Sequence, residues 1–274
     1  MKRLGLTCGA FVARDFLSEF SYRLSFAMVF LGIFVQVATW YLVSHFVEAV
    51  GDGVTLRSFT GNLDYFAYVL VGMMLQRFMN IAMYNYAGTI RGEQVTGTLE
   101  SILITPTPLP HVLIGASCWS YVMAGIQMAT MLLFGVWVFG VELQAGGWLV
   151  AMSTILMSIF ALSGIGILSA AFVIYFKRGN PVNFVISTAS LLFGNVIIPV
   201  QSLPDSLGWI STFVPIAYAT EAVRRAIYHG AGFAEVQHEL LVLAGFGLVM
   251  IPVGLVAARL AIRHAKREGT LVQY

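Results

Sequence analysis

Long apolar stretches alternate with short polar ones along most of this 274-residue chain. A helix that rises 1.5 Å per residue needs roughly 20 apolar residues to cross about 30 Å of hydrocarbon. Stretches of that length, free or nearly free of charge, cover residues 24–47, 65–87, 109–141, 148–176, 182–200 and 240–258. The pattern therefore predicts an all-α polytopic membrane protein with six transmembrane helices.

Residues 1–23 precede the first apolar stretch and have an amphipathic pattern of their own. Four apolar residues share one helical face, namely Ala13, Phe16, Leu17 and Phe20. The polar residues Arg14, Asp15, Ser18 and Glu19 fall on the other face. This division is typical of a helix that lies in the membrane interface. The alternative is a cytoplasmic extension of the first span.

The distribution of Lys and Arg predicts the orientation in the membrane, because cytoplasmic loops carry an excess of both. With the N-terminus inside, most of the basic residues are cytoplasmic: Lys2, Arg3, Arg14, Arg23, Arg91, Lys177, Arg178, Arg259, Arg263, Lys266 and Arg267. Only Arg57, Arg224 and Arg225 are then outside. We therefore expect a multi-pass protein of the cytoplasmic (inner) membrane with both termini cytoplasmic.

The composition excludes several classes of protein. Hydrophobic residues make up 58% of the chain and charged residues 10%, whereas soluble domains carry about 25% charged residues. The net charge of +2 is too small for a protein that binds nucleic acid by neutralising phosphates. Two cysteines cannot form a disulfide scaffold, and the five histidines lack metal-ligand spacing. We expect no metal site.

The chain also lacks the common catalytic motifs. The phosphate-binding pattern G-x-x-x-x-G-K-[ST] is absent, as are H-E-x-x-H, G-x-S-x-G and S-x-x-K. We therefore expect neither enzymatic activity of its own nor a bound cofactor in this chain.

The polar segment 88–108 separates the second and third predicted spans. Thr98 can cap a short helix, and Pro106 ends that helix at the preceding residue. Leu99, Ile102 and Leu103 share one face of it at spacings of three and four residues. The pattern predicts a short amphipathic helix on the cytoplasmic side. It could also be an ordinary loop helix packed on its own spans.

Two motifs resemble those of ABC-2 type transporter permeases, the membrane subunits of one class of ATP-driven exporter. The first is Glu93, Gly97-Thr98-Leu99-Glu100, Leu103 and Thr105-Pro106, which is similar to E-x-x-x-G-T-L-E-x-L-L-x-T-P. The second is Pro199, Leu203-Pro204, Leu207, Pro215, Tyr218, Glu221 and Arg224, which is similar to P-x-x-x-L-P-x-x-L, P-x-x-Y and E-x-x-R before the last span. The resemblance covers nearly the whole chain, so residues 1–274 are identified as a single ABC-2 type transmembrane domain.

The resemblance implies that segment 88–108 holds a coupling helix that docks on a separate ATP-binding subunit. The residues expected to make that contact are Glu93, Gly97, Thr98, Leu99, Glu100, Ile102, Leu103 and Pro106. Gly92 and Gln94 depart from the family, in which charged residues are common at these positions. ATP and Mg would be bound by the partner subunit.

The same resemblance implies an exporter built from two ATPase subunits and two permease copies, with a homodimer as the simplest assembly. Its substrate would be amphiphilic, such as a drug, a lipid or a lipid-linked glycan. The alternative function is an ion- or proton-coupled secondary carrier, although such carriers usually hold intramembrane carboxylates. A membrane-embedded enzyme is disfavoured by the missing catalytic clusters.

Residues 201–235 are too apolar for a free loop and too interrupted by proline for a span. Irregular backbone at membrane depth must be buried in protein or must line a cavity. The segment resembles the family's external re-entrant helices, and a plain external loop is the alternative. Glu221, Arg224 and Arg225 lie in it and are expected to pair locally, in a structural role.

A few polar and small residues lie within the predicted spans. Polar side chains there usually form hydrogen bonds between helices, but the resemblance makes several of them candidates for lining the pathway: Asn80, Asn183, Ser187, Phe193 and Asn195. Arg77 either has a function or snorkels to the cytoplasmic end of its span. The small residues Ser163, Gly164, Gly166, Ser169 and Ala170 predict close helix packing.

Overall fold

The computed structural model of the chain describes residues 2–50, 57–95, 109–176 and 181–267. Its long helices are α1 (Lys2–Ser21), α2 (Arg23–Val50), α4 (Tyr65–Val95), α6 (Leu109–Trp137), α7 (Trp148–Phe176) and α11 (Gln237–Arg267). Its short helices are η1 (Ala145–Gly147), α8 (Pro181–Phe193), η2 (Val200–Ser202), α9 (Asp205–Gly208), η3 (Trp209–Phe213) and α10 (Pro215–His229), of which the η elements are 3₁₀-helices. Every regular element in these ranges is a helix, which confirms the all-α prediction.

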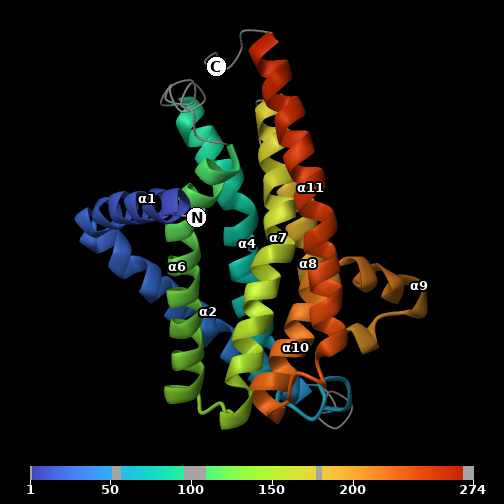
Figure 1. Ribbon diagram of the computed structural model, residues 1–274. Coiled ribbons are helices and arrows are strands. Elements are labelled where there is room, and N and C mark those ends of the chain that lie inside the picture. The colour runs from blue at the N-terminus through green and yellow to red at the C-terminus, as the bar shows by residue number, and fades with distance from the viewer. Residues whose placement is uncertain (1, 51–56, 96–108, 177–180, 268–274) are drawn as a thin grey trace.

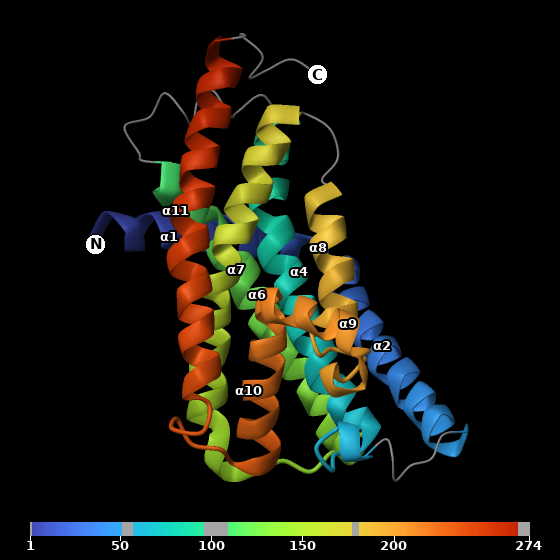
Figure 2. The ribbon, with the colours of Figure 1, turned by 90° about the vertical axis from the view of Figure 1, so that its right-hand side faces the viewer.

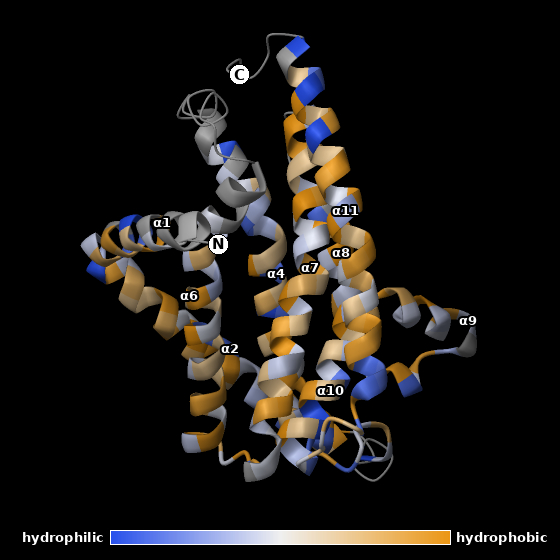
Figure 3. Ribbon diagram, in the orientation of Figure 1, coloured by the Kyte–Doolittle hydropathy of each residue, from blue (hydrophilic) through white to orange (hydrophobic). Residues whose placement is uncertain are grey.

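The bundle is organised around α4 (Figure 1). In the most apolar 18-residue window of α4, 78% of the residues are buried, against 11% in α2 and 17% in α11. Helix α4 packs against α6, α7 and α10, and α7 packs against α11. Figure 3 shows hydrophobic residues along the middle of α2 and α11, whose outward faces are apolar. Such faces suit hydrocarbon better than water.

Five helical stretches are long and apolar enough to cross a membrane: Arg23–Val50, Tyr65–Thr89, Ser117–Trp137, Trp148–Phe176 and Gln237–Ala265. They correspond to five of the six predicted spans. The prediction for 148–176 matches α7 residue for residue. The third prediction, 109–141, runs too far, because α6 ends at Trp137 before Gly140 adopts a left-handed φ of 76°.

The predicted fifth span, 182–200, is not one continuous helix. Helix α8 ends at Phe193 after 13 residues, a length of about 20 Å. The amide of Gly194 donates to the Ser190 carbonyl at 2.8 Å, and Asn195 follows with a left-handed φ of 57°. Gly and Asn are the residues that commonly end helices in this way, a signal that a count of apolar residues does not include.

Helices α8 and α10, one after the other, extend over the part of the bundle along which a single fifth span was predicted to run. Figure 2 shows α8 beginning near the upper end of the bundle and ending partway down, whereas α10 continues to the lower end. Between them η2, α9 and η3 project sideways. Helix α10 begins at Pro215, which favours the first turn, and ends at Gly230 with a φ of 65°.

Helix α10 is therefore no open external loop. It packs against α7, α11 and α4, and most of its residues are buried. Residues 215–229 of the predicted segment 201–235 are therefore part of the bundle.

Two helices extend beyond their predicted ends. Helix α4 continues to Val95 rather than stopping at residue 87, and it therefore includes the first eight residues of the predicted polar segment 88–108. Helix α11 covers 237–267 rather than 240–258. A hydropathy window detects where a helix leaves the apolar region, whereas the helix itself continues until its hydrogen-bonding pattern is interrupted.

Helix α1 lies crosswise to the long helices (Figure 1). It packs against α6, where Phe16 meets Trp119 edge to face at 5.5 Å between ring centroids. Leu17 and Phe20 remain exposed. The chain changes direction between α1 and α2, so α1 is not a straight extension of the first span.

The small residues of α7 allow the close packing that their sequence predicts. A Cβ placed on Gly164 would lie 2.4 Å from the backbone carbon of Met250 in α11. A Cβ on Gly166 would lie 2.6 Å from the Tyr86 ring of α4. Helix α7 can therefore contact both neighbours through its glycines.

Candidate functional site

Most of the residues expected to contact an ATPase lie outside the described residues. These are Gly97, Thr98, Leu99, Glu100, Ile102, Leu103 and Pro106. The backbone of Glu93 belongs to the last turn of α4. The structure thus places the start of the predicted coupling segment at the end of the most buried long helix.

A stripe of polar side chains joins α4 to α8 along the middle of the bundle. Ser187 Oγ donates to Asn80 Oδ1 at 2.7 Å, and Gln76 Nε2 donates to the Ser187 carbonyl at 3.2 Å. One helical turn away, Asn183 Nδ2 donates to the Met83 carbonyl at 3.1 Å. Asn183 and Gln76 are buried, whereas Asn80 and Ser187 are half-buried. We call these four residues the amide stripe.

The structure thus brings three of the five candidate pathway residues together in the amide stripe, and it adds Gln76, which sequence reasoning missed. Gln76 stands between Leu75 and Arg77, and its i, i+4 spacing from Asn80 was the available signal. Phe193 is half-buried at the end of α8 and packs on the core. Asn195 lies beyond the end of α8 and belongs to a different group of residues.

That second group, the charged network, connects four elements at the lower end of the bundle. The Tyr68 hydroxyl of α4 donates to Asn195 Oδ1, and Asn195 Nδ2 donates to Glu221 Oε2 at 3.2 Å. Arg225 then bridges two carboxylates, with 2.9 Å from Nε to Glu221 Oε1 and 3.1 Å from one terminal nitrogen to Glu239 Oε1. Glu239 lies in the first turn of α11. The network therefore connects α4, α10 and α11 with residues 194–199, which we call the segment after α8.

The predicted local pairing of Glu221 is confirmed for Arg225 and is wrong for Arg224. The Arg224 side chain is buried and turns to backbone instead: its Nε and one terminal nitrogen donate to the Tyr68 carbonyl at 3.1 and 2.8 Å. The same terminal nitrogen lies 3.3 Å from the Val196 carbonyl, and the guanidinium stacks 3.5 Å from the Tyr68 ring centroid. Arg224 therefore fastens the segment after α8 to α4.

Arg77 does not snorkel to the end of its helix. Its Nε donates to Gln127 Oε1 of α6 at 2.7 Å, and a terminal nitrogen donates to Gln36 Oε1 of α2 at 3.1 Å. The side chain is half-buried, and no carboxylate of the described ranges lies within ion-pair distance of it. The positively charged Arg77 side chain of α4 is therefore hydrogen-bonded to two neutral amides, one on α6 and one on α2.

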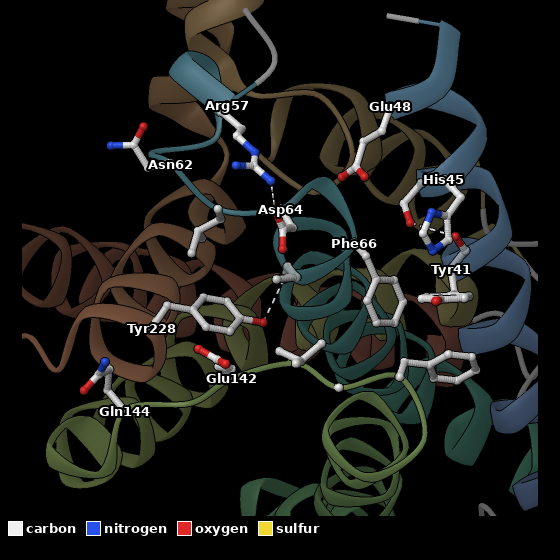
Figure 4. A pocket seen from close by; sticks show the side chains of 16 residues that line it. Tyr41, His45, Glu48, Arg57, Asn62, Asp64, Phe66, Glu142, Gln144 and Tyr228 are labelled. Carbon is white, nitrogen blue, oxygen red and sulfur yellow. Dashed lines mark hydrogen bonds and ion pairs between the residues drawn. The ribbon is translucent and has the colours of Figure 1, made fainter. Parts of the chain in front are cut away.

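A cavity of about 590 Å³ opens at the lower end of the bundle, between α2, the start of α4 and the loop after α6 (Figure 4). Arg57 and Asp64 pair across its mouth at 2.7 Å, and the Tyr228 hydroxyl donates to the Ala67 carbonyl at 2.8 Å on its wall. Glu48 and Glu142 also line it. None of the sequence-predicted site residues lies on this cavity.

Comparisons with known proteins agree with the helical architecture. Residues 7–228 match the family described as ABC-2 type transporter. One similar protein is the "Probable multidrug ABC transporter permease YbhR" of Escherichia coli K12, which is 22% identical over 182 residues. That match covers 65% of this chain but only 48% of the relative, so the chain spans about half the length of that protein.

Another similar protein is "Nodulation protein J" of Sinorhizobium fredii. It is 24% identical over 219 residues, which cover 77% of this chain and 81% of the relative.

Proposed function

The chain belongs to the ABC-2 type transporter family, and from this premise we propose that it is the permease subunit of an ATP-binding cassette exporter. Two ATPase subunits would drive it, and a second copy of the chain would complete the pathway as a homodimer. The substrate would be an amphiphile such as a drug, a lipid or a lipid-linked glycan. The word "multidrug" in the name of the Escherichia coli relative agrees with a drug-like substrate.

The observation that supports this proposal best is the position of α4. Helix α4 has 31 residues, a length of about 45 Å. One of its ends leads into the predicted coupling segment, its middle carries the amide stripe, and its other end carries Tyr68 of the charged network. A rigid helix with contacts at both ends can transmit a displacement, which a flexible loop cannot.

In this proposal an ATPase bound at segment 88–108 would tilt or shift α4. The movement would change the packing of α8 at the amide stripe and of the segment after α8 at the charged network. Residues 201–235 would close the external end of the pathway as re-entrant helices, and the amide stripe with Phe193 and Asn195 would line it. Both termini would lie in the cytoplasm, and the chain from α8 to the end of α10 would make the fifth of six crossings, with the re-entrant segment as its external half.

The experiment is purification of the chain together with its candidate ATPase, followed by ATP-driven export from inverted vesicles. We expect a stable complex whose ATP hydrolysis depends on this chain. Glu93→Ala and Gly97→Pro should reduce export to background while both variants still insert, because they alter the contact that receives the work. Glu142→Ala, which removes a carboxylate from the opposite end, should leave export unchanged.

Unchanged ATP-dependent export by both coupling variants would contradict the proposed contact. Transport driven by an ion gradient with no partner present would instead support the alternative, an ion- or proton-coupled carrier.

A further inference from the structure

A groove of about 550 Å³ lies between α7 and α11, near the end of α7. Eight residues line it: Leu168, Ala171, Phe172, Tyr175, Ala257, Leu260, Ala261 and His264. Ala171 and Ala261 are buried where the two helices meet, whereas Tyr175 and Leu260 are exposed at the edges. Apart from the Tyr175 hydroxyl and the His264 ring, the lining is hydrocarbon. The groove therefore suits an apolar chain.

Leu260, which lines the groove, is also the last residue of an exposed apolar stripe on α11. The stripe has spacings of four, three and four residues: Val249, Val253, Val256 and Leu260. All four side chains are exposed, and residues at these spacings are neighbours on one face of a helix. The stripe is about 16 Å long, which is close to the thickness of hydrocarbon in one bilayer leaflet, about 15 Å. Its length and polarity are those of a surface that faces a lipid chain.

The same spacing leads from the stripe to two arginines. Arg263 follows Leu260 by three residues, and Arg267 follows Arg263 by four. Both side chains are exposed, and Figure 3 shows hydrophilic residues at this end of α11 beyond a hydrophobic stretch. The His264 ring stacks on Tyr175 at 4.8 Å between centroids. The arginines therefore lie level with the end of α7, where a span meets the lipid head groups.

No acidic residue near this surface offsets the positive charge on the two helices. Helix α7 has no charged residue, and the one acidic residue of α11, Glu239, lies in its first turn at the opposite end. Among the described side chains, none forms an ion pair with Arg263 or Arg267. A guanidinium binds phosphate through paired N–H groups, and basic residues at the end of a membrane helix attract anionic lipids. Charge and apolar surface thus match the two parts of one kind of molecule.

We propose that this surface binds an anionic phospholipid of the surrounding bilayer. Arg263 and Arg267 bind its phosphate, one acyl chain lies in the groove, and the other lies along the stripe. The groove supplies the position and the arginines supply the selectivity for charge. In the orientation proposed above, the site lies in the cytoplasmic leaflet. Binding itself depends neither on that orientation nor on an ATPase.

The experiment measures which lipid occupies the stripe by fluorescence quenching. Val256→Cys, in a Cys8→Ser, Cys118→Ser background, carries a bimane label, and the purified full chain is placed in phosphatidylcholine nanodiscs. Part of the lipid is then replaced by phosphatidylglycerol or by phosphatidylcholine with dibrominated chains, because bromine quenches the label only at short range. We expect phosphatidylglycerol to be preferred about tenfold, the effect of two arginines at the membrane surface.

Variants of the arginines test the charge. Arg263→Gln and Arg267→Gln should each lower the preference about threefold, and the double variant should abolish it. Arg23→Gln is the matched control, because Arg23 is an exposed arginine at the start of α2, away from α7 and α11 in Figures 1 and 2. It should keep the tenfold preference.

Ala257→Phe tests the groove, because the larger side chain fills the groove and leaves the charge unchanged. The preference should fall about threefold, since a lipid whose chain has no fixed position spends less time with its phosphate at the arginines. Should this variant fail to fold, as judged by gel filtration, the arginine variants still test the proposal.

Equal quenching by the two lipids would mean that zwitterionic lipid covers the surface, and no quenching by either would mean that protein covers it. Both results would overturn the proposal. An equal loss for Arg23→Gln and the double variant, or an unchanged preference in a folded Ala257→Phe protein, would also overturn it. Failure of ATP-driven export with an intact lipid preference would overturn the exporter and keep the lipid site.

Discussion

The Arg224 side chain holds the segment after α8 against α4. Its guanidinium is buried, donates to carbonyls of α4 and of the segment after α8, and stacks on the Tyr68 ring. A guanidinium suits this position because it is planar and has several donors in fixed directions. A lysine ammonium would have the same charge but could not make the same set of contacts.

We therefore expect Arg224→Lys to lower the free energy of unfolding by about 2–4 kcal/mol, since at least one buried carbonyl contact and the stacking are lost. The measurement is the midpoint of SDS-induced unfolding in mixed micelles. Arg225→Lys is the control, because Arg225 is 43% exposed and its ion pairs tolerate a change of cation, with a loss below about 1 kcal/mol. Equal losses for the two variants would contradict the role of Arg224.

Arg77 differs from Arg224 in having only side-chain partners, Gln127 and Gln36. An intramembrane charge without a nearby carboxylate is costly, and such residues commonly mark functional sites. The hydrogen bonds to two neighbouring helices, α6 and α2, explain how the charge is tolerated. They also show that the sequence-based choice between function and snorkelling omitted a third possibility, lateral hydrogen bonding to neighbouring spans.

At the scale of elements, the segment after α8 can pack closely on α4 because residue 72 of α4 is a glycine. A Cβ placed on Gly72 would lie 2.2 Å from the Val196 carbonyl oxygen, closer than any real contact. That oxygen belongs to backbone, which cannot rotate aside as a long side chain could. The close approach also puts the Val196 carbonyl within reach of Arg224.

Gly72→Ala should therefore separate the segment after α8 from α4, and we expect a loss of about 1–3 kcal/mol in unfolding free energy. Gly88→Ala is a control in the same helix, because nothing lies within 4 Å of a Cβ placed there. That variant should be neutral or stabilised by up to about 1 kcal/mol, the usual difference in helix propensity. Both variants can be compared by the same unfolding assay, and a Gly72→Ala protein as stable as Gly88→Ala would show that the segment can move without cost.

At the scale of the whole molecule, the path of the chain determines which ends share a side. Five long helices alone would leave the two ends of the chain on opposite sides of a membrane. Helices α8 and α10 in series add one further passage from the upper to the lower end (Figure 2). Helix α2 therefore runs away from the upper end of the bundle and α11 runs back to it, although α11 extends farther up than the start of α2 (Figure 1).

This path predicts the labelling of single cysteines in a Cys8→Ser, Cys118→Ser background. Glu142→Cys and Glu235→Cys lie at the lower end, and an impermeant maleimide should label both in intact cells. Arg267→Cys lies at the upper end and should react only after the cells are permeabilised. Labelling of Arg267→Cys in intact cells, with protection of the other two, would mean that the orientation is inverted.

Several features could be predicted from the sequence because they depend on residues close together in the chain. Windows free or nearly free of charge marked five of the long helices, and the small residues of α7 indicated its close packing with α11. The family could be recognised from two short motifs and their order. The pairing of Glu221 with Arg225 was also within reach, since i, i+4 partners are neighbours on a helix.

What only the tertiary structure decided are the contacts between residues far apart in the chain. The partners of Arg224 are 28 and 156 residues away, and those of Arg77 are 41 and 50 residues away. Hydropathy is a local average, so it registered 182–200 as one apolar stretch and did not separate α8 from the turn after Phe193. That turn is stable because backbone groups freed from the helix find partners on α4 and α10, including the Gly194 carbonyl bonded to Thr220 and the Ile197 carbonyl bonded to Tyr65. Such partners exist only once the helices have packed.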